Sequence, residues 1–290
     1  MRLAHLHFPG ITPFNTVSQI QQVLTLRNLA HKKAISSSYT SSTPPDPTII
    51  TFTPNPVYTT GRRDLPPSNT SSPSDQQPSL ELSLPPPLEP IRPLLSSNDP
   101  QRNPPIAEYH PTLRGGQTTY HGPGQLVAYT ILDLRRLGLS PRCHIRLLEN
   151  SVIDLLSKYG VRGFVTSDAG VWVNDRNANA NAQKITAVGV HLRRNISSYG
   201  IGLNITEEPM WFFKQIVACG LEGKEATSLE RQGVKLSLRE AADGFVQAFV
   251  DRLQADFPPG PERRREALEG VYEVGVEDVV GSSSSSSSSS

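Results

Sequence analysis

The chain opens with an apolar run that is followed by apolar positions at helical spacing. Leu3–Phe8 predicts a strand, and a helix is predicted from about Thr16. The apolar positions of this helix are Ile20, Val23, Leu24 and Leu26. Further along, Thr48–Tyr58 alternates β-branched and aromatic residues before a glycine and two arginines. That pattern predicts a strand that runs into a turn.

Two later helices are marked by their caps. Ser140 and Pro141 supply an N-cap and a first-turn proline for a helix that ends at Gly160. Its predicted apolar face consists of Ile145, Leu148, Val152, Leu155, Leu156 and Tyr159. The other helix begins at Ser237, where Glu240 three residues later completes a capping box. Its predicted buried face consists of Leu238, Ala241, Phe245, Phe249 and Leu253.

Strands are predicted directly before the first of these helices and in the region between the two. Leu126–Leu134, just before the first helix, is dense in β-branched and aromatic residues and also predicts a strand. Three shorter strands are predicted at Gly170–Val173, Lys184–Leu192 and Ser198–Ile205, before an aromatic helical turn that follows Pro209. Because strands and helices mix without a regular β-α-β order, the predicted fold class is α+β.

Composition limits how much of the chain is expected to fold. Of the 26 prolines, 12 lie in residues 66–105, and the last nine residues are all serine. Segments of this kind bury too little apolar surface to offset the entropy lost on ordering. We therefore predict one domain over residues 1–258, interrupted by a disordered insertion at 66–105, and a low-complexity tail at 259–290.

Charge and hydropathy exclude several classes of partner. The formal charge is +1, from 28 basic and 27 acidic residues, which gives no electrostatic reason to expect nucleic acid. No apolar run approaches the roughly 18 residues that a membrane-spanning helix needs, so no membrane span is expected. The first 45 residues lack Asp and Glu, as in an organelle transit peptide, but they overlap the first predicted strand and helix.

Two cysteines are too few for a disulfide framework, so both are treated as free thiols. Cys219 follows the aromatic helical turn and precedes a glycine. A lone cysteine is more often a small buried hydrophobe than a nucleophile, and a nearby cation is one way to activate it. Lys184 could supply that charge, although alone it also fits a strand-end lysine. Cys143 lies in the first turn of a helix whose apolar stripe indicates a structural role.

A glycine-rich stretch, Arg114–Gln125, contains four glycines, a proline and His121. Such a stretch lets backbone amides approach a ligand, but it also fits a tight hairpin loop without one. His121 could orient a substrate or hold the loop by a hydrogen bond. The histidines and cysteines show no metal-ligand spacing, so no metal is assigned.

Taken together, these segments resemble one family. RGGQTTYHGPGQLVAY is similar to the signature stretch of the lipoyl(octanoyl) transferases. KITAVGV resembles the lysine strand of that family, SYGIGLNI its next strand, ACGL its nucleophile turn, and PVYTTGRRD its Pro-Val-Tyr-Thr segment. The resemblance extends from residue 1 to about 255, apart from the insertion. It implies a biotin/lipoate protein ligase-like catalytic domain with a mixed β-sheet flanked by helices.

The resemblance also implies a reaction. Octanoyl would pass from acyl carrier protein to Cys219 as a thioester, and then to a lysine of a lipoyl domain in protein lipoylation. Lys184 would lower the pKa of the thiol, and no cofactor would be needed. The implied acceptors are the lipoyl domains of 2-oxoacid dehydrogenases and the glycine cleavage H protein, and the implied compartment is the mitochondrion. The alternatives are an ATP-dependent lipoate or biotin protein ligase, and a non-catalytic lipoyl-domain binding protein.

The family's pattern implies a set of residues that line the acyl pocket. They are Arg114, Gly115, Gly116, Gln117, Thr118, Thr119, Tyr120, His121, Ala187, Val188, Gly189, Gly200, Ile201 and Gly202. Two positions depart from that pattern. Tyr199 stands where the family has histidine, and Ala218 stands where it has the proline before the nucleophile. These departures bear on substrate positioning more than on the reaction.

Overall fold

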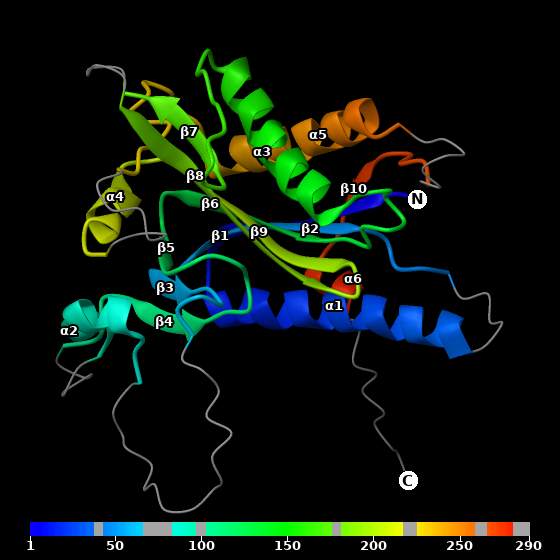
Figure 1. Cartoon of the computed structure of the whole chain (residues 1–290), viewed down its shortest axis with the longest axis horizontal. Helices are drawn as coiled ribbons and strands as arrows, with labels where there is room; N and C mark the ends of the chain where they lie inside the picture. Colours follow the sequence, from blue (N-terminus) through cyan, green and yellow to red (C-terminus); the bar gives the residue numbers. More distant parts are fainter. Residues whose placement is uncertain are drawn as a thin grey trace, which may run out of the picture.

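The computed structural model describes residues 1–37, 43–65, 83–96, 103–175, 181–216, 225–258 and 266–280. Its centre is a seven-stranded mixed sheet in the order β10-β1-β2-β6-β9-β8-β7 (Figure 1). The strand β1 runs parallel to both of its neighbours, and the remaining pairs are antiparallel. The strands are β1 (Leu3–Thr12), β2 (Thr48–Pro54), β6 (Gln125–Ile131), β7 (Val171–Asn174), β8 (Ala182–Arg193), β9 (Ile196–Asn204) and β10 (Val271–Glu273).

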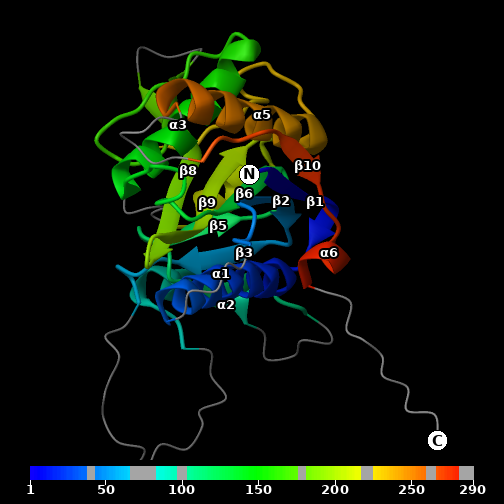
Figure 2. The same cartoon turned by 90° about the vertical axis from the view of Figure 1, so that its right-hand side faces the viewer.

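Helices cover both faces of this sheet. The helices α3 (Pro141–Lys158) and α5 (Leu238–Asp256) pack together on one face, and α1 (Phe14–Ser37) covers the other (Figure 2). Successive residues of a strand point to opposite faces. In β2, Ile49 therefore joins the core under α3 and α5, whereas Ile50 and Phe52 join the core under α1. The predicted α+β class with a mixed sheet flanked by helices is confirmed.

A small second sheet, in the order β4-β3-β5, lies beside the large one. Its strands are β3 (Val57–Thr60), β4 (Glu108–Pro111) and β5 (Thr119–His121). The single strand predicted at Thr48–Tyr58 is therefore two strands, β2 and β3, in different sheets. The turn between them contains Asn55, whose side-chain oxygen accepts a hydrogen bond of 3.0 Å from the Phe14 amide at the start of α1.

The prediction of a disordered insertion over residues 66–105 is wrong for residues 83–96. These residues form a 3-10 helix, η1 (Pro86–Ile91), and a short helix, α2 (Arg92–Leu95). Leu88, Ile91 and Leu95 are buried in a third apolar cluster with Tyr58 and Tyr120. Three well-spaced apolar side chains are enough to order this segment, because the small sheet provides an apolar surface for them to cover.

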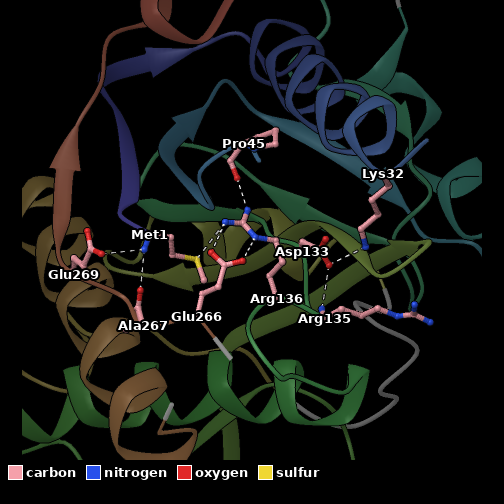
Figure 3. Close-up of polar contacts among 9 residues, drawn as sticks. All are labelled: Met1, Lys32, Pro45, Asp133, Arg135, Arg136, Glu266, Ala267 and Glu269. Atoms are coloured by element: carbon pink, nitrogen blue, oxygen red, sulfur yellow. Dashed lines mark hydrogen bonds and ion pairs between the residues drawn. The ribbon is translucent and has the colours of Figure 1, made fainter. Parts of the chain in front are cut away.

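The predicted tail is also wrong for residues 266–280. The strand β10 pairs with β1, and the short helix α6 (Val276–Val280) packs on α1. Arg136 holds the start of this segment through two contacts of 2.9 Å with the Glu266 carboxylate, and it also donates to the Pro45 carbonyl at 2.7 Å (Figure 3). The Met1 amine donates to the Ala267 carbonyl at 2.9 Å. These contacts tie the segment to the start of the chain and to the loop that follows β6.

The capped helices form as predicted. The Ser140 side chain accepts from the Cys143 amide, and Ser237 and Glu240 make both hydrogen bonds of a capping box. The apolar face of α3 is buried except at Ile145, which is half-buried, and Tyr159, which is exposed. In α1, Val23 and Leu26 are exposed, contrary to their predicted grouping with Ile20 and Leu24. Within the described residues, no helix has the length and apolar character needed to cross a membrane.

The buried contacts of η1 generate a stability prediction. We expect Leu88→Ala to lower the free energy of unfolding by roughly 2 to 4 kcal/mol, because it removes a fully buried side chain and leaves a cavity. Urea denaturation measures the change. Ile106→Ala, at a side chain that is 51% exposed, is the control and should shift it by less than about 0.5 kcal/mol. Equal effects of the two substitutions would contradict the packing of residues 83–96 on the core.

Candidate active site

A row of residues without bulky side chains forms the floor of a cavity on the large sheet. Gly189 of β8 is paired with Gly200 of β9, and the row ends at β6, where Gly200 is paired with the bulkier Tyr129. Two residues further along each strand, on the same face, Ala187 is paired with Gly202. These residues line a cavity of about 340 Å³. The glycines leave space above the backbone that any larger side chain would occupy.

The loop between β4 and β5 closes one side of this cavity. The buried Arg114 donates from Nη2 to the Thr59 carbonyl and hydroxyl oxygens, each at 2.9 Å, and from Nη1 to the Gly115 carbonyl at 3.1 Å. The Gly115 amide donates to the Val190 carbonyl of β8 at 2.9 Å. A Cβ on Gly189 would come within 3.1 Å of the Arg114 Cδ. The glycine at this position therefore allows the arginine to lie close to the sheet.

Most of the residues predicted to line the acyl pocket lie around this cavity. They are Arg114, Gly115, Gly116, Gln117, Thr119, His121, Ala187, Val188, Gly189, Gly200, Ile201 and Gly202. Thr118 and Tyr120 do not line it. Thr118 donates through its amide and hydroxyl to the Asp64 carboxylate, and Tyr120 stacks on Phe212 with a centroid separation of 4.2 Å. Because side chains alternate along β5, Thr119 and His121 face the cavity and Tyr120 faces away.

His121 is a neutral side chain in this environment. Burial, together with the charge of Arg114, lowers its pKa to about 4. Its Nδ1 atom lies 3.1 Å from Gln125 Oε1. A Cβ on Gly202 would come within 2.8 Å of the His121 Cε1, so this glycine makes room for the ring. At neutral pH the ring can therefore serve as a hydrogen-bonding group without carrying charge.

Lys184 of β8 forms a second wall of the cavity with the loop residues Asp168 and Ala169. Its Nζ donates to the Ala169 carbonyl at 3.0 Å and lies 4.8 Å from the centroid of the Trp172 ring. Its backbone is bonded to the segment that begins at Glu225. The Lys184 amide donates to the Glu225 carbonyl, and the Thr227 amide donates to the Lys184 carbonyl, each at 2.9 Å. The half-buried lysine is thus held at the cavity by both its side chain and its backbone.

Only one of the two cysteines, Cys143, lies in the part of the chain that the structure describes. Cys219 lies outside the described residues, in the stretch 217–224, and so does Ala218. Cys143 is half-buried at the start of α3 and packs against the core under α3 and α5. The structure does not bring Cys143 into the cavity lining. That position fits the structural role predicted for this thiol.

Several cavity residues were not predicted as pocket residues. Arg63 belongs to the PVYTTGRRD segment, so that motif could have indicated it. Tyr199, with a backbone φ of +60°, receives a hydrogen bond of 3.4 Å at its hydroxyl from the Leu113 amide. The loop residues Ser167, Asp168 and Ala169 also line the cavity. Nothing in their sequence distinguishes them from an ordinary loop, and their position results from the packing of β7 against β8.

Comparisons with known proteins agree with this geometry. Residues 106–250 match the family model of the lipoyl protein ligase A/B catalytic domain. A Schizosaccharomyces pombe protein named "Probable octanoyltransferase" is 35% identical over 248 residues, covering 84% of this chain and 94% of the relative. An octanoyltransferase of Solibacter usitatus is 42% identical over 52% of this chain and 66% of its own length. A human mitochondrial octanoyl-acyl-carrier-protein:protein N-octanoyltransferase is 40% identical over 50% of this chain and 61% of its own.

Solved structures support the fold. The P. falciparum protein LipL1 in complex with lipoate aligns with a TM-score of 0.57 at 9% identity, covering 97% of this chain and 68% of its own. A bipartite lipoate protein ligase from Thermoplasma acidophilum aligns with a TM-score of 0.51 at 12% identity, covering 93% and 87%. At such low identity these structures establish the lipoate protein ligase-like fold alone. Together with the sequence relatives, they lead to the conclusion that this chain belongs to the octanoyltransferase family, a family of acyltransferases built on the lipoyl protein ligase A/B catalytic domain.

Proposed function

We propose that this protein transfers octanoyl from acyl carrier protein to a lysine of lipoyl domains, through a thioester on Cys219. The cavity supports this proposal, since its lining combines glycines with apolar residues such as Ile145, Val188 and Ile201. Its volume of about 340 Å³ lies within the usual range of small-ligand sites. A medium-length acyl chain needs an apolar site of this kind, with the reacting carbonyl at its polar end.

The observation that carries the proposal is the position of Lys184. Its side chain lines the cavity, and its backbone is hydrogen-bonded to Glu225, the first described residue after the stretch that contains Cys219. Cys219 precedes Glu225 by only six residues in the sequence, and Glu225 is bonded to Lys184. The length of this connection limits how far Cys219 can lie from Lys184. A cation near a thiol favours the thiolate, which is the form that attacks a thioester.

The positive charges of the cavity fit the chemistry of acyl transfer. Arg114 is buried beside it, and Arg63 and Lys184 also contribute to its lining. Such charges stabilise a thiolate and the oxyanion that forms when it attacks the acyl carbonyl. Transfer from one thioester to another is nearly balanced in energy, so the reaction needs no ATP. Lys184 would then accept a proton from the incoming lysine amine.

The relatives support the proposed partners and compartment. The human relative is named for transfer from octanoyl-acyl carrier protein to protein and is labelled mitochondrial. We therefore assign acyl carrier protein as the donor, and the lipoyl domains of 2-oxoacid dehydrogenases and the glycine cleavage H protein as acceptors. A mitochondrial location follows for a eukaryotic member, although the bacterial relative shows that the activity itself requires no such compartment.

The rival reaction on this fold is ATP-dependent ligation. A lipoate-protein ligase A bound with ATP aligns with this chain at a TM-score of 0.52 and 12% identity. A ligase of that kind forms an acyl-adenylate and needs no nucleophilic cysteine. Lipoate-dependent exchange of labelled pyrophosphate into ATP would therefore identify a ligase. The proposed transferase should show none, and a non-catalytic lipoyl-domain binding protein should show neither exchange nor acyl transfer.

The proposed intermediate can be observed by mass. After incubation with octanoyl-acyl carrier protein, we expect one octanoyl adduct that hydroxylamine removes, since it is a thioester. The adduct should disappear in Cys219→Ser and persist in Cys143→Ser, the matched control at a thiol away from the cavity lining. Peptide mapping then locates the acyl group. An adduct that survives Cys219→Ser, or that maps to Cys143, would overturn the assignment of the nucleophile.

The pairing of Lys184 with Cys219 has a separate readout. Removal of the ammonium in Lys184→Ala should raise the pKa of the Cys219 thiol, and so raise the pH at which iodoacetamide labels it by about one unit or more. The rate of labelling as a function of pH is measured in the Cys143→Ser background, so that one thiol reports. The control is Lys158→Ala, at the exposed C-terminal end of α3. An unchanged profile in Lys184→Ala would refute the pairing.

A further inference from the structure

A chain of buried hydrogen bonds runs from His121 into the body of the protein. Nδ1 of His121 lies 3.1 Å from Gln125 Oε1, Gln125 Nε2 donates to Asn204 Oδ1 at 2.7 Å, and Asn204 Nδ2 donates to the Thr227 carbonyl at 2.8 Å. All four residues are buried. The last of them is also the residue whose amide donates to the Lys184 carbonyl. The chain therefore connects the two walls of the cavity.

The direction of this chain is fixed at its inner end. A backbone carbonyl can only accept, so Asn204 must present its NH₂ group to Thr227 and its oxygen to Gln125. Gln125 must then present its NH₂ group to Asn204 and its oxygen to His121. An amide oxygen can only accept, so the proton of the neutral imidazole must lie on Nδ1. The three inner residues thus select one of the two tautomers of His121.

The other nitrogen of the ring is left as a hydrogen-bond acceptor. Nε2 carries the lone pair in this tautomer and makes no hydrogen bond within the part of the chain that the structure describes. Protonation does not remove this acceptor at neutral pH, because burial and the charge of Arg114 lower the pKa of His121 to about 4. The cavity that Lys184 lines therefore contains a neutral, oriented acceptor.

We propose that Gln125 and Asn204 are positioning residues that hold His121 in its Nδ1–H tautomer, so that Nε2 accepts a hydrogen bond from the amine of the acceptor lysine. This role rests on the proposed function, in which that amine attacks the acyl thioester. Among the groups that react in the second half of the reaction, the thioester carbonyl, its sulfur and the acyl chain have no hydrogen to donate. The amine does, and it is the donor that fits an acceptor at this point.

The step balances without a proton on His121. The amine nitrogen forms a bond to the acyl carbon, the carbon–sulfur bond breaks, and the sulfur leaves with the electron pair as thiolate. One amine proton passes to Lys184, which is neutral at this stage because its ammonium proton left with the thiol of acyl carrier protein in the first half of the reaction. The hydrogen bond to Nε2 fixes the direction of the amine lone pair, and the ring remains in the same tautomer throughout.

The tautomer can be measured directly. Nitrogen-15 NMR of the imidazole at neutral pH should show a protonated Nδ1 and an unprotonated Nε2 at His121 in the wild-type protein. In Asn204→Leu the Gln125 amide is free to turn, and the proton should shift in part or entirely to Nε2. Asn204→Asp should retain the wild-type tautomer, because a buried protonated carboxyl both donates to Thr227 and accepts from Gln125. A wild-type Nε2–H tautomer would overturn the proposal.

Kinetics separate this role from a structural one. In single-turnover experiments we expect Asn204→Leu to slow transfer from the acyl-enzyme to the lipoyl domain by about tenfold or more, with acyl-enzyme formation changed by less than about twofold. Asn204→Asp should restore transfer. Asn28→Leu removes a buried asparagine in α1, whose side chain donates to the Leu24 carbonyl, and is the matched control with wild-type rates.

Two other outcomes have defined meanings. Equal slowing of both half-reactions in Asn204→Leu would contradict the proposal, since it indicates a structural role or a hydrogen bond to the acyl donor instead of the amine. If the wild-type protein forms no octanoyl adduct, the proposed function itself fails. The NMR measurement needs no substrate, and it therefore still decides whether Gln125 and Asn204 select the tautomer.

Discussion

The site depends on the absence of side chains at Gly189, Gly200 and Gly202, where β8 and β9 pass beneath the cavity. A Cβ at position 189 would come within 3.1 Å of Arg114, and one at position 202 within 2.8 Å of the His121 ring. Because Gly189 is paired with Gly200, the open row crosses two neighbouring strands. The sheet can therefore hold a buried guanidinium and a buried imidazole directly against its backbone. The cavity between them is a consequence of that approach.

The buried charge and the neutral ring are linked. Taking a cation out of water is costly unless polar groups surround it, and Arg114 is held by oxygens of Thr59 and Gly115. Burial lowers the pKa of His121, and the field of Arg114 acts in the same direction because it disfavours a second cation close by. One wall thus offers a permanent positive charge and a neutral acceptor. The other offers Lys184, whose flexible side chain can bind or release a proton.

Features encoded by a few adjacent residues could be predicted from the sequence. The caps at Ser140 and Ser237 are of this kind, because the residues that satisfy the helix ends lie within one turn. The segments η1 and α2 could not be predicted, since the burial of Leu88 depends on Tyr58 and Tyr120, which are distant in sequence. A family motif indicated which residues lie near the pocket, but a motif does not show toward which face of a strand each side chain points. The predicted set therefore included Tyr120, whose side chain is turned away from the cavity by the alternation along β5.

The backbone, more than any side chain, sets the distance between the two walls. Ala187 is paired with Gly202, three residues along β8 from Lys184, and Gly202 lies beneath the His121 ring. The same strand pair carries Asn204, which continues the hydrogen-bond chain from Gln125 to Thr227. The ladder between β8 and β9 therefore fixes both the separation of lysine and histidine and the protonation pattern of the ring. A one-residue slip in that register would change both at once, since it would move every side chain to the opposite face.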